Sequence, residues 1–517
     1  MQKSLIFIVF IFVSISMFTG CANKETTEKN NTLTYGIEFE IEKINPILDE
    51  EQEIDSLLFR GLTKPSTDRS PVGDLAKKWT VSEDGKTYVF YLHEQAKFSD
   101  GEEVTAQDVK FTLDKILDLK TNTPLFSDFE PIENVEATNK HVVTIFLKYP
   151  YPAILDKLRV GIVPKHLLQS QEMNKSTFNQ KPVGNGPYKI KEWKKDKTII
   201  LEKNPYYYGT KPKIEEIIFK YVPDPNARLM QLKTGEIDLA YLEANQMKSI
   251  KKTDDITIHR ISTADYRAFM YNLQHPLFQD AKVRQALNKM VNKGELVDGI
   301  LQGNGEIAYG PLQRSWAHAP SIEKETYNKE EAIRLLKETG WIKNKNGILE
   351  KDGKTFSFDI VAPSTDPIRV AIAQSLATTF KEYGIEAKPQ IKDFKSLDIS
   401  KEDTFVIGWG SPFDPDDHTY RIFHRSQMKD GLSNFGHYKD PIVDETLGKA
   451  RQLSNQEERK QLYQQFQEQL TVNPPFNFLM YVDALYGANK SVKGISDSTL
   501  GHHGYGIMWN IESWEIQ

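Results

Sequence analysis

The stretch that decides the fold reads LAKKWTVSEDGKTYVFYLHEQAKFSDGEEVTAQDV over residues 75–109. Two strand-like runs flank Asp84 and Gly85, a dipeptide typical of tight turns, so the pattern predicts a β-hairpin. Thr105 stands directly before an apolar-periodic run, and a threonine in this position favours the start of a helix. A hairpin followed by a helix predicts a small α/β unit, which we extend over residues 71–185.

Strand and helix patterns continue on both sides of this unit. Residues 33–39 alternate as a strand does, and residues 283–288 carry apolar side chains at helical spacing. Glycines and prolines punctuate residues 182–188, and a second change of pattern falls near residue 275. At about 150 residues per domain, the length suggests roughly three core-forming units. The sequence therefore predicts a multi-domain α/β protein.

The composition excludes several classes of protein. The chain has 517 residues, a formal charge of −6 and 39% hydrophobic residues, which is enough apolar content for ordinary cores and excludes a disordered chain. A nucleic-acid binder normally carries a clustered positive excess, and the sequence has none. We expect no nucleic-acid partner.

The amino-terminal residues read as a lipoprotein signal. Lys3 precedes an apolar run over residues 5–18, and Thr19 and Gly20 lead to Cys21, the one cysteine of the chain. The alternative is a membrane-anchor helix, but such a helix needs about 20 apolar residues. We therefore predict a signal peptide over residues 1–20, acylation (including palmitate) at Cys21, and a polar tether over residues 21–32.

Enzyme motifs are absent from the sequence. There is no Gly-x-Ser-x-Gly elbow, no Gly-x-x-x-x-Gly-Lys-Ser/Thr loop and no His-Glu-x-x-His, because Gln95, Ala96 and Lys97 follow His93 and Glu94. Acylation would consume the one cysteine, so no nucleophilic thiol would remain. We expect a protein that is not an enzyme and has no cofactor; a secreted hydrolase is the remote alternative.

Residues 75–109 resemble the signature segment of the family 5 extracellular solute-binding proteins, the peptide/nickel-type binding components of ABC importers. One departure is His93, where the family usually has arginine or lysine. The resemblance continues over nearly the whole mature chain, through residues 161–166, 182–188, 204–207, 235–238, 283–287, 340–341 and 408–410.

The resemblance implies a periplasmic-binding-protein-like α/β fold of the cluster C type, with two hinged lobes, an extra inserted subdomain and the ligand cleft between the lobes. It also implies a monomer on the extracellular face of the cell membrane, whose permease and ATPase partners are separate chains. The implied division is domain I over residues 33–70, 186–275 and 485–517, domain II over 71–185, and domain III over 276–484.

The segment over residues 409–424 bears on the choice of ligand. It resembles the Trp-Gly-x-Pro-Tyr-Asp-Pro segment of nickel-chelate binders in the family, although peptide binders also carry an Asp-Pro there. Trp409 and Phe413 are expected to form an apolar wall against the ligand, or else to belong to the core. His418 or His424 is a candidate nickel ligand, because imidazole suits a borderline cation.

The carboxylates of the same segment allow two interpretations. Asp414, Asp416 and Asp417 are candidates to hold an ammonium group, while Asp416 or Asp417 suits the N-cap of the helix that follows. Nickel chelates are the favoured ligand and short peptides the alternative.

Other candidates lie elsewhere in the chain. Arg159 stands in a strand-like run, where a guanidinium must be paired. Its fork suits a carboxylate of the ligand, and the alternative is an ion pair within the protein. In the nickel binders that this chain resembles, an arginine near this position holds the chelator's carboxylate. Tyr266 and Arg267 are weaker candidates to line the cleft. His502 and His503 form a second candidate pair for metal, because flanking glycines let a loop approach a cleft closely.

Overall fold

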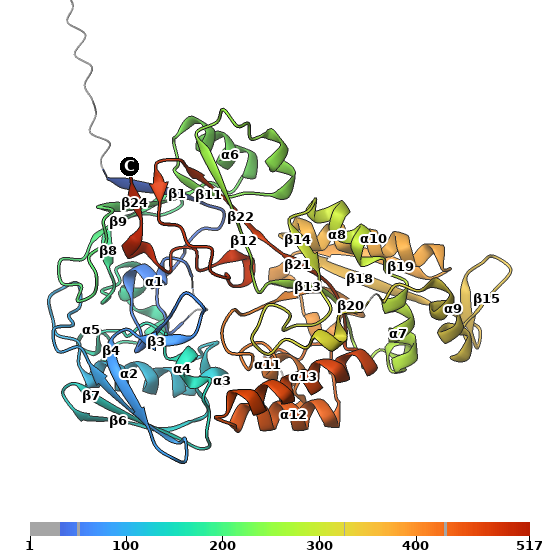
Figure 1. Ribbon diagram of the computed structural model, residues 1–517, viewed down its shortest axis with the longest axis horizontal. Coiled ribbons are helices and arrows are strands. Elements are labelled where there is room, and N and C mark those ends of the chain that lie inside the picture. Colours follow the sequence, from blue (N-terminus) through green and yellow to red (C-terminus); the bar gives the residue numbers. More distant parts are fainter. Residues whose placement is uncertain (1–30, 49–51, 325, 429–431) are drawn as a thin grey trace, which may run out of the picture.

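The computed structural model describes residues 31–48, 52–324, 326–428 and 432–517. The chain forms two lobes, each built on its own β-sheet, with a smaller unit beside the first lobe (Figure 1). The two-lobed α/β architecture is therefore confirmed. The predicted signal peptide and Cys21 lie outside the described residues. Within those ranges, no helix combines the length and the apolar character that crossing a bilayer requires.

The first lobe is built on a seven-stranded mixed sheet. Its central strand β1 runs parallel to both of its neighbours, β10 and β11. The β1 side chains alternate as the sequence predicted, with Leu33 and Tyr35 buried in the core. From edge to edge the strands are β12 (Ile256–Ile261), β22 (Ala484–Asn489), β11 (Leu239–Tyr241), β1 (Thr32–Ile37), β10 (Glu216–Tyr221), β9 (Thr198–Lys203) and β8 (Tyr188–Lys194).

Helices α1 and α6 belong to this lobe. The short helix α1 (Asp55–Leu58) contributes residues near its start to the cavity described below. Helix α6 (Pro225–Thr234) begins after Asp224, whose carboxylate accepts the Ala227 N–H, and ends at Gly235 in the left-handed conformation.

The second lobe has a six-stranded mixed sheet with helices on both faces (Figure 1). Helix α10 (Pro367–Glu382) packs on one face, and α12 (Pro441–Gln452) with α13 (Gln456–Val472) covers the other. Helices α7 (Ala281–Lys289), α8 (Lys293–Leu301) and α9 (Lys329–Glu338) complete the α10 side. The strand order is β14 (Gly305–Ile307), β21 (Phe476–Val482), β13 (Tyr266–Tyr271), β20 (Thr404–Trp409), β18 (Ser357–Pro363) and β19 (Glu386–Lys392).

The smaller unit has the predicted hairpin and helix. Strands β4 (Ala76–Val81) and β5 (Thr87–Leu92) pair across a turn in which Gly85 takes a positive φ of 67°. Strands β7 (Val142–Leu147) and β6 (Ile132–Asn139) extend them into a four-stranded sheet. Helix α2 (Ala106–Leu117) follows Thr105, as expected, and packs on this sheet, while the short helices α3 (Phe126–Phe129) and α4 (Ile154–Lys157) lead towards the second lobe.

The division into three domains stays a prediction, but strand pairing corrects one of its boundaries. Strand β13 lies inside the range predicted for domain I, yet it pairs with β20 and β21 in the second sheet. The chain crosses between the lobes at residues 262–265, and it returns at Asp483, between β21 and β22. A strand buried on both faces shows no alternation in its sequence, so only the change of pattern after it was visible.

Candidate ligand-binding site

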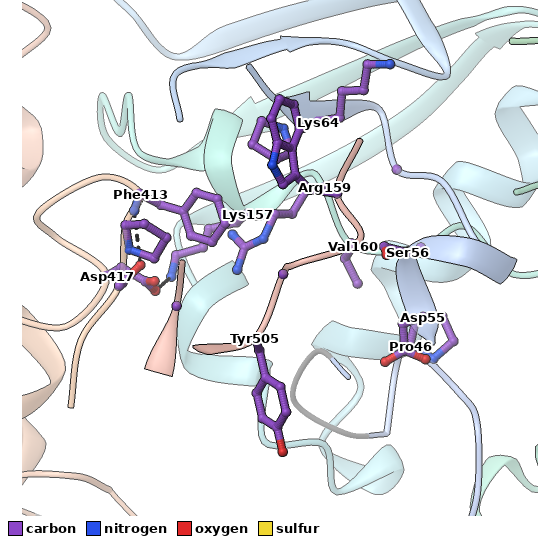
Figure 2. Close-up of a pocket in the computed structure, with 18 of the residues that line it drawn as sticks. Pro46, Asp55, Ser56, Lys64, Lys157, Arg159, Val160, Phe413, Asp417 and Tyr505 are labelled. Carbon is purple, nitrogen blue, oxygen red and sulfur yellow. Dashed lines mark hydrogen bonds and ion pairs between the residues drawn. The ribbon is translucent and has the colours of Figure 1, made fainter. Parts of the chain in front are cut away.

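A cavity of about 430 Å³ lies where both lobes and the smaller unit meet. Its wall is assembled from segments far apart in the sequence, and Figure 2 shows how their side chains converge. The lining comes from Pro46 and from segments within residues 52–74, 124–129, 157–161, 410–421 and 501–509.

Arg159 lines the cavity with its guanidinium stacked on an aromatic ring. The guanidinium carbon lies 3.8 Å from the centroid of the Phe413 ring, and Nη1 donates to the Asp156 carbonyl oxygen at 2.7 Å. In Figure 2 the Arg159 and Phe413 side chains lie side by side. The smaller unit supplies the arginine and the second lobe supplies the ring. The structure thus brings these two predicted ligand-binding residues together across the lobe boundary.

Close to Arg159, the buried ammonium group of Lys157 links the smaller unit to the second lobe. Lys157, only 5% exposed, forms an ion pair with Asp417 of the second lobe and lies 3.3 Å from a carboxylate oxygen of Asp128. Burial alone would lower the pKa of Lys157, but Asp128 and Asp417 raise it above its usual value. Lys157 is therefore charged. Burial alone would raise the pKa of Asp417, but Lys157 keeps it well below its usual value, so this ion pair holds the smaller unit against the second lobe.

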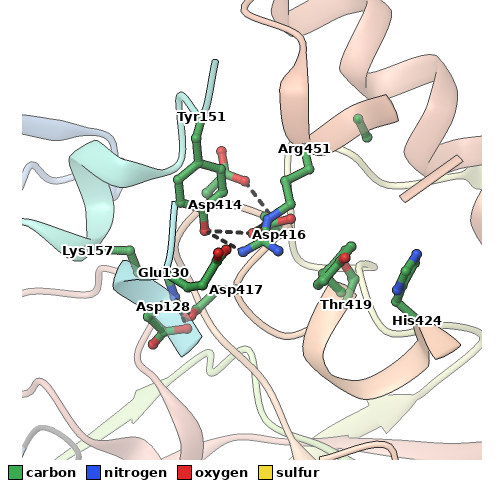
Figure 3. A network of polar contacts seen from close by, with 12 residues as sticks. Asp128, Glu130, Tyr151, Lys157, Asp414, Asp416, Asp417, Thr419, His424 and Arg451 are labelled. Atoms are coloured by element: carbon green, nitrogen blue, oxygen red, sulfur yellow. Dashed lines mark hydrogen bonds and ion pairs between the residues drawn. The ribbon is translucent and has the colours of Figure 1, made fainter. Parts of the chain in front are cut away.

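A second contact between the same parts is centred on Asp416 (Figure 3). The Tyr151 hydroxyl donates to an Asp416 carboxylate oxygen at 2.7 Å, and Arg451 Nε lies 3.3 Å from the same oxygen. Neither Asp416 nor Asp417 caps the helix that follows, because α11 (Tyr420–Phe423) begins after Thr419. That interpretation was wrong, since the cations and the tyrosine hydroxyl of other segments attract both carboxylates.

Asp414, in the same loop as Asp416 and Asp417, has partners in both the second lobe and the smaller unit. Both of its carboxylate oxygens accept hydrogen bonds from Arg459, at 2.6 and 2.7 Å. Its backbone N–H donates to the Asp156 carboxylate at 3.1 Å. Burial and the nearby Asp414 raise the pKa of Asp156 to about 7. The three acidic residues of this loop thus bind groups of the protein itself.

His418 lines the cavity but presents a hydrogen-bond donor. Its Nδ1 lies 3.1 Å from the Gly410 nitrogen, and because a backbone N–H can only donate, Nδ1 accepts. Burial lowers the pKa of His418 to about 4, so the ring is neutral and its proton is on Nε2. In this tautomer Nε2 suits a carboxylate oxygen, and neither nitrogen offers a lone pair to a metal ion.

His502 also has both ring nitrogens engaged. Nδ1 lies 2.7 Å from Oδ1 of Asp265, and Nε2 lies 3.4 Å from Nη2 of Arg369. A carboxylate can only accept and a guanidinium can only donate, so Nδ1 carries the proton and Nε2 accepts. His502 is therefore bound within the protein.

His503 is the histidine whose ring stays available to a ligand. It lines the cavity, and no hydrogen bond of its ring nitrogens occurs among the residues that the structure describes. Burial and the neighbouring His502 keep its pKa well below the usual value, so the imidazole is neutral. A neutral imidazole is the form that binds transition metals.

The other predicted site residues lie outside the cavity lining and have partners within the chain. The Trp409 ring contacts the His418 ring edge to face. Tyr266 is fully buried, and its neighbour Arg267 pairs with Asp265 and Asp366. His424 stacks on Tyr420 with ring centroids 4.3 Å apart. Asp414 pairs with Arg459, as described above.

The sequence did not single out two residues that shape this site. Lys157 and Asp265 are buried and charged, and each pairs with a residue more than 200 positions away. A charged residue inside an apolar run is the only signal that local sequence offers for such a role. Within the described ranges, no group of three or more histidine, cysteine, aspartate or glutamate side chains could hold a metal ion.

Comparisons with known proteins place the chain in a family. The model of the bacterial extracellular solute-binding proteins, family 5 middle, matches residues 70–430. Protein XP55 of Streptomyces lividans is 33% identical over 472 residues, which is 90% of this chain and 86% of that protein.

Two solved structures share the fold over 94% of this chain and 99% of their own chains. NikZ from Campylobacter jejuni, in complex with Ni(L-His), is 42% identical with a TM-score of 0.88. The oligopeptide-binding protein AppA from Bacillus subtilis, in complex with a nonapeptide, is 30% identical with a TM-score of 0.82. Solute-binding proteins of family 5 are transport components and not enzymes. The chain therefore belongs to family 5 of the bacterial extracellular solute-binding proteins, and it is a substrate-binding component of an ABC importer.

Proposed function

We propose that this protein captures nickel as a chelate with a small carboxylate-bearing molecule, such as histidine, and delivers it to the membrane permease. The observation that carries this proposal is the pairing of two groups in one cavity. His503 offers a neutral imidazole with no ring hydrogen bond among the described residues, and Arg159 offers a guanidinium fixed against Phe413. One group suits the metal and the other suits the carboxylate.

The shortage of protein ligands favours a chelate over the bare ion. The described residues contain no cluster of three metal-binding side chains, and the rings of His418 and His502 have no lone pair to offer. Among the cavity histidines His503 is therefore the one that supplies an imidazole, and the chelator supplies the other ligands. His418 then donates from Nε2 to a chelator oxygen. Recognition is thus largely indirect, through the organic part of the cargo.

The acidic residues of the lining also favour a carboxylate-bearing ligand. Glu53 accepts the backbone N–H groups of Gly506 at 2.8 Å and Met508 at 2.7 Å, and Asp128 and Asp417 face Lys157. These acids are bound to groups of the protein, so they do not form a ready site for a peptide's terminal ammonium. The likeness to the Campylobacter jejuni protein in complex with Ni(L-His) supports the same choice.

Short peptides are the second candidate, favoured by the likeness to AppA in complex with a nonapeptide. In that case Arg159 would pair with the peptide's terminal carboxylate. The cavity volume of about 430 Å³ limits such a ligand to a short peptide in this conformation.

Isothermal titration of the mature protein separates the two candidates. We expect heat of binding with nickel plus L-histidine, and much less with nickel alone or with a pool of di- to pentapeptides. Binding of the peptides without any response to nickel–histidine would refute the nickel proposal. Amidated peptides are the matched control, because they lack the carboxylate that Arg159 would hold.

We also propose that Cys21 carries the lipid that anchors the protein on the outer face of the cell membrane. The order of charged, apolar and small residues before Cys21 supports this. Labelled palmitate should enter the wild-type protein and not Cys21→Ser, which should be released into the medium. Equal labelling of both proteins would overturn the proposal.

A further inference from the structure

The turn that contains His502 and His503 is held by one buried carboxylate. Asp265, 2% exposed, accepts the His502 Nδ1–H at 2.7 Å and the backbone N–H of His503 at 3.1 Å. The two histidines belong to the segment that follows the first lobe's strand β22, whereas Asp265 directly precedes β13 of the second lobe. The turn is therefore fastened across the boundary between the lobes.

His503 needs such support because of its backbone conformation. Its φ of 55° lies in the left-handed region, which costs a residue other than glycine about 1 kcal/mol or more. The surrounding structure must stabilise this conformation if the imidazole is to keep its direction. The hydrogen bond from the His503 backbone to Asp265 supplies a contact at the residue itself.

The carboxylate is itself part of a closed ring of side chains. Asp265 pairs with Arg267, whose Nη2 lies 3.2 Å from Asp366, and Asp366 lies 3.0 Å from Nε of Arg369. Arg369 Nη2 returns to His502 Nε2 at 3.4 Å, which closes the ring. Asp366 also caps helix α10 by accepting backbone N–H groups, so the ring is attached to a long, rigid element.

We infer that Asp265 is a positioning residue for the metal-binding imidazole, acting through His502 and the His503 backbone to aim His503 into the cavity. His502 is then a support that does not contact the cargo. This inference rests on the proposed nickel-chelate function. Groups that orient a metal ligand without touching the metal typically change affinity by about 10- to 100-fold when they are removed.

Two substitutions of His502 test the supporting role directly. The amide nitrogen of asparagine stands as many bonds from Cβ as imidazole Nδ1 does, so His502→Asn keeps the hydrogen bond to Asp265 while His502→Leu removes it. For nickel with L-histidine, we expect the dissociation constant of His502→Asn to stay within about threefold of wild type. That of His502→Leu should rise by about tenfold or more. Equal losses in both variants would mean that His502 itself binds the metal, which would overturn the inference.

A double-mutant cycle tests Asp265. We expect Asp265→Asn to weaken nickel–histidine binding by about 10- to 100-fold in the wild-type background, and to have little further effect in His503→Ala. Independent, additive losses would overturn the inference. Asp440→Asn is the matched control, since Asp440 is equally buried in the second lobe but caps α12 outside the cavity lining. Thermal unfolding of each variant without ligand reports any loss of fold.

X-ray absorption of the bound nickel gives a readout that a purely structural role would not change. Nickel in Asp265→Asn, at saturating nickel–histidine, should show one imidazole fewer than in the wild type, as in His503→Ala. A wild type that does not bind nickel–histidine would refute the proposed function. A wild type that binds, a weakened His503→Ala and an unchanged Asp265→Asn would refute the positioning role alone.

Discussion

In the proposed function, Arg159 is the residue that recognises the carboxylate of the chelator. Its replacement by alanine removes a charge-assisted hydrogen bond, which contributes about 1.5 to 3 kcal/mol. At about 1.4 kcal/mol per decade, Arg159→Ala should raise the dissociation constant for nickel–histidine by tenfold to a hundredfold or more. Arg159→Lys keeps the charge but loses the planar stack on Phe413, so we expect an intermediate loss. Wild-type affinity of Arg159→Ala in isothermal titration would remove the arginine from the site.

His418 predicts how stability depends on pH. In the unfolded chain its imidazole takes up a proton near pH 6.5, whereas in the folded protein burial lowers its pKa to about 4. Its contribution to the free energy of unfolding is therefore present above about pH 6.5 and is lost as the pH falls towards 4, by at most about 3 kcal/mol.

Urea unfolding at pH 7.5 and at pH 5 checks this dependence. His418→Asn keeps an acceptor for the Gly410 N–H but cannot be protonated, so it should lose less stability on acidification than the wild type does. The same loss in both proteins would show that His418 does not titrate as described.

Sequence alone singled out several of the residues that line the cavity. Arg159, Phe413, His418, His502 and His503 were candidates from residue type and pattern, and all of them line the cavity. The roles of the adjacent histidines could not be separated, because the left-handed backbone and the partners of each ring appear only in three dimensions.

Among the helices and strands, α2 shows how one carboxylate fixes the start of a helix. Asp108 accepts the backbone N–H of Thr105 at 2.9 Å and its hydroxyl at 2.7 Å, and its other oxygen accepts the Lys165 N–H at 2.9 Å. Asp108→Ala leaves these partly buried donors without their acceptor, so the free energy of unfolding should fall by about 2 to 4 kcal/mol.

Chemical denaturation measures this change. Asp114→Ala is the control on the same helix, because Asp114 is exposed and its carboxylate pairs with Lys110, a contact that contributes about 0.5 kcal/mol or less. Similar losses in both variants would contradict the importance of the buried cap.

The elements that local chemistry defines were the ones that sequence predicted best. The hairpin around Asp84 and Gly85 and the helix after Thr105 formed where expected. Strand β13 falls in the range predicted for domain I, although it belongs to the second lobe. Its partners β20 and β21 lie more than a hundred residues further along the chain, and no local pattern reports such pairing.

For the whole molecule, closure of the lobes should depend on the pair of Lys157 and Asp417. Asp417→Asn leaves the buried ammonium with Asp128 alone, so the closed form should be less stable. Breaking a buried charged pair mainly raises the dissociation rate. We therefore expect faster release of nickel–histidine with little change in the association rate.

Stopped-flow measurements of both rates test this expectation. Asp444→Asn is the control, since Asp444 pairs with the exposed Arg425 inside the second lobe. An unchanged release rate in Asp417→Asn would show that this pair does not hold the lobes together.

The position of the His502–His503 turn in the chain also affects biosynthesis. Ribosomes build proteins from the amino terminus, and strand β22, the last strand of the two large sheets in chain order, ends at Asn489. All strands of both large sheets are therefore synthesised before residues 501–509, which form part of the cavity wall. A premature stop codon shortly after residue 489 would leave every strand of both large sheets encoded, but it would remove His503 and the part of the cavity wall that residues 501–509 form.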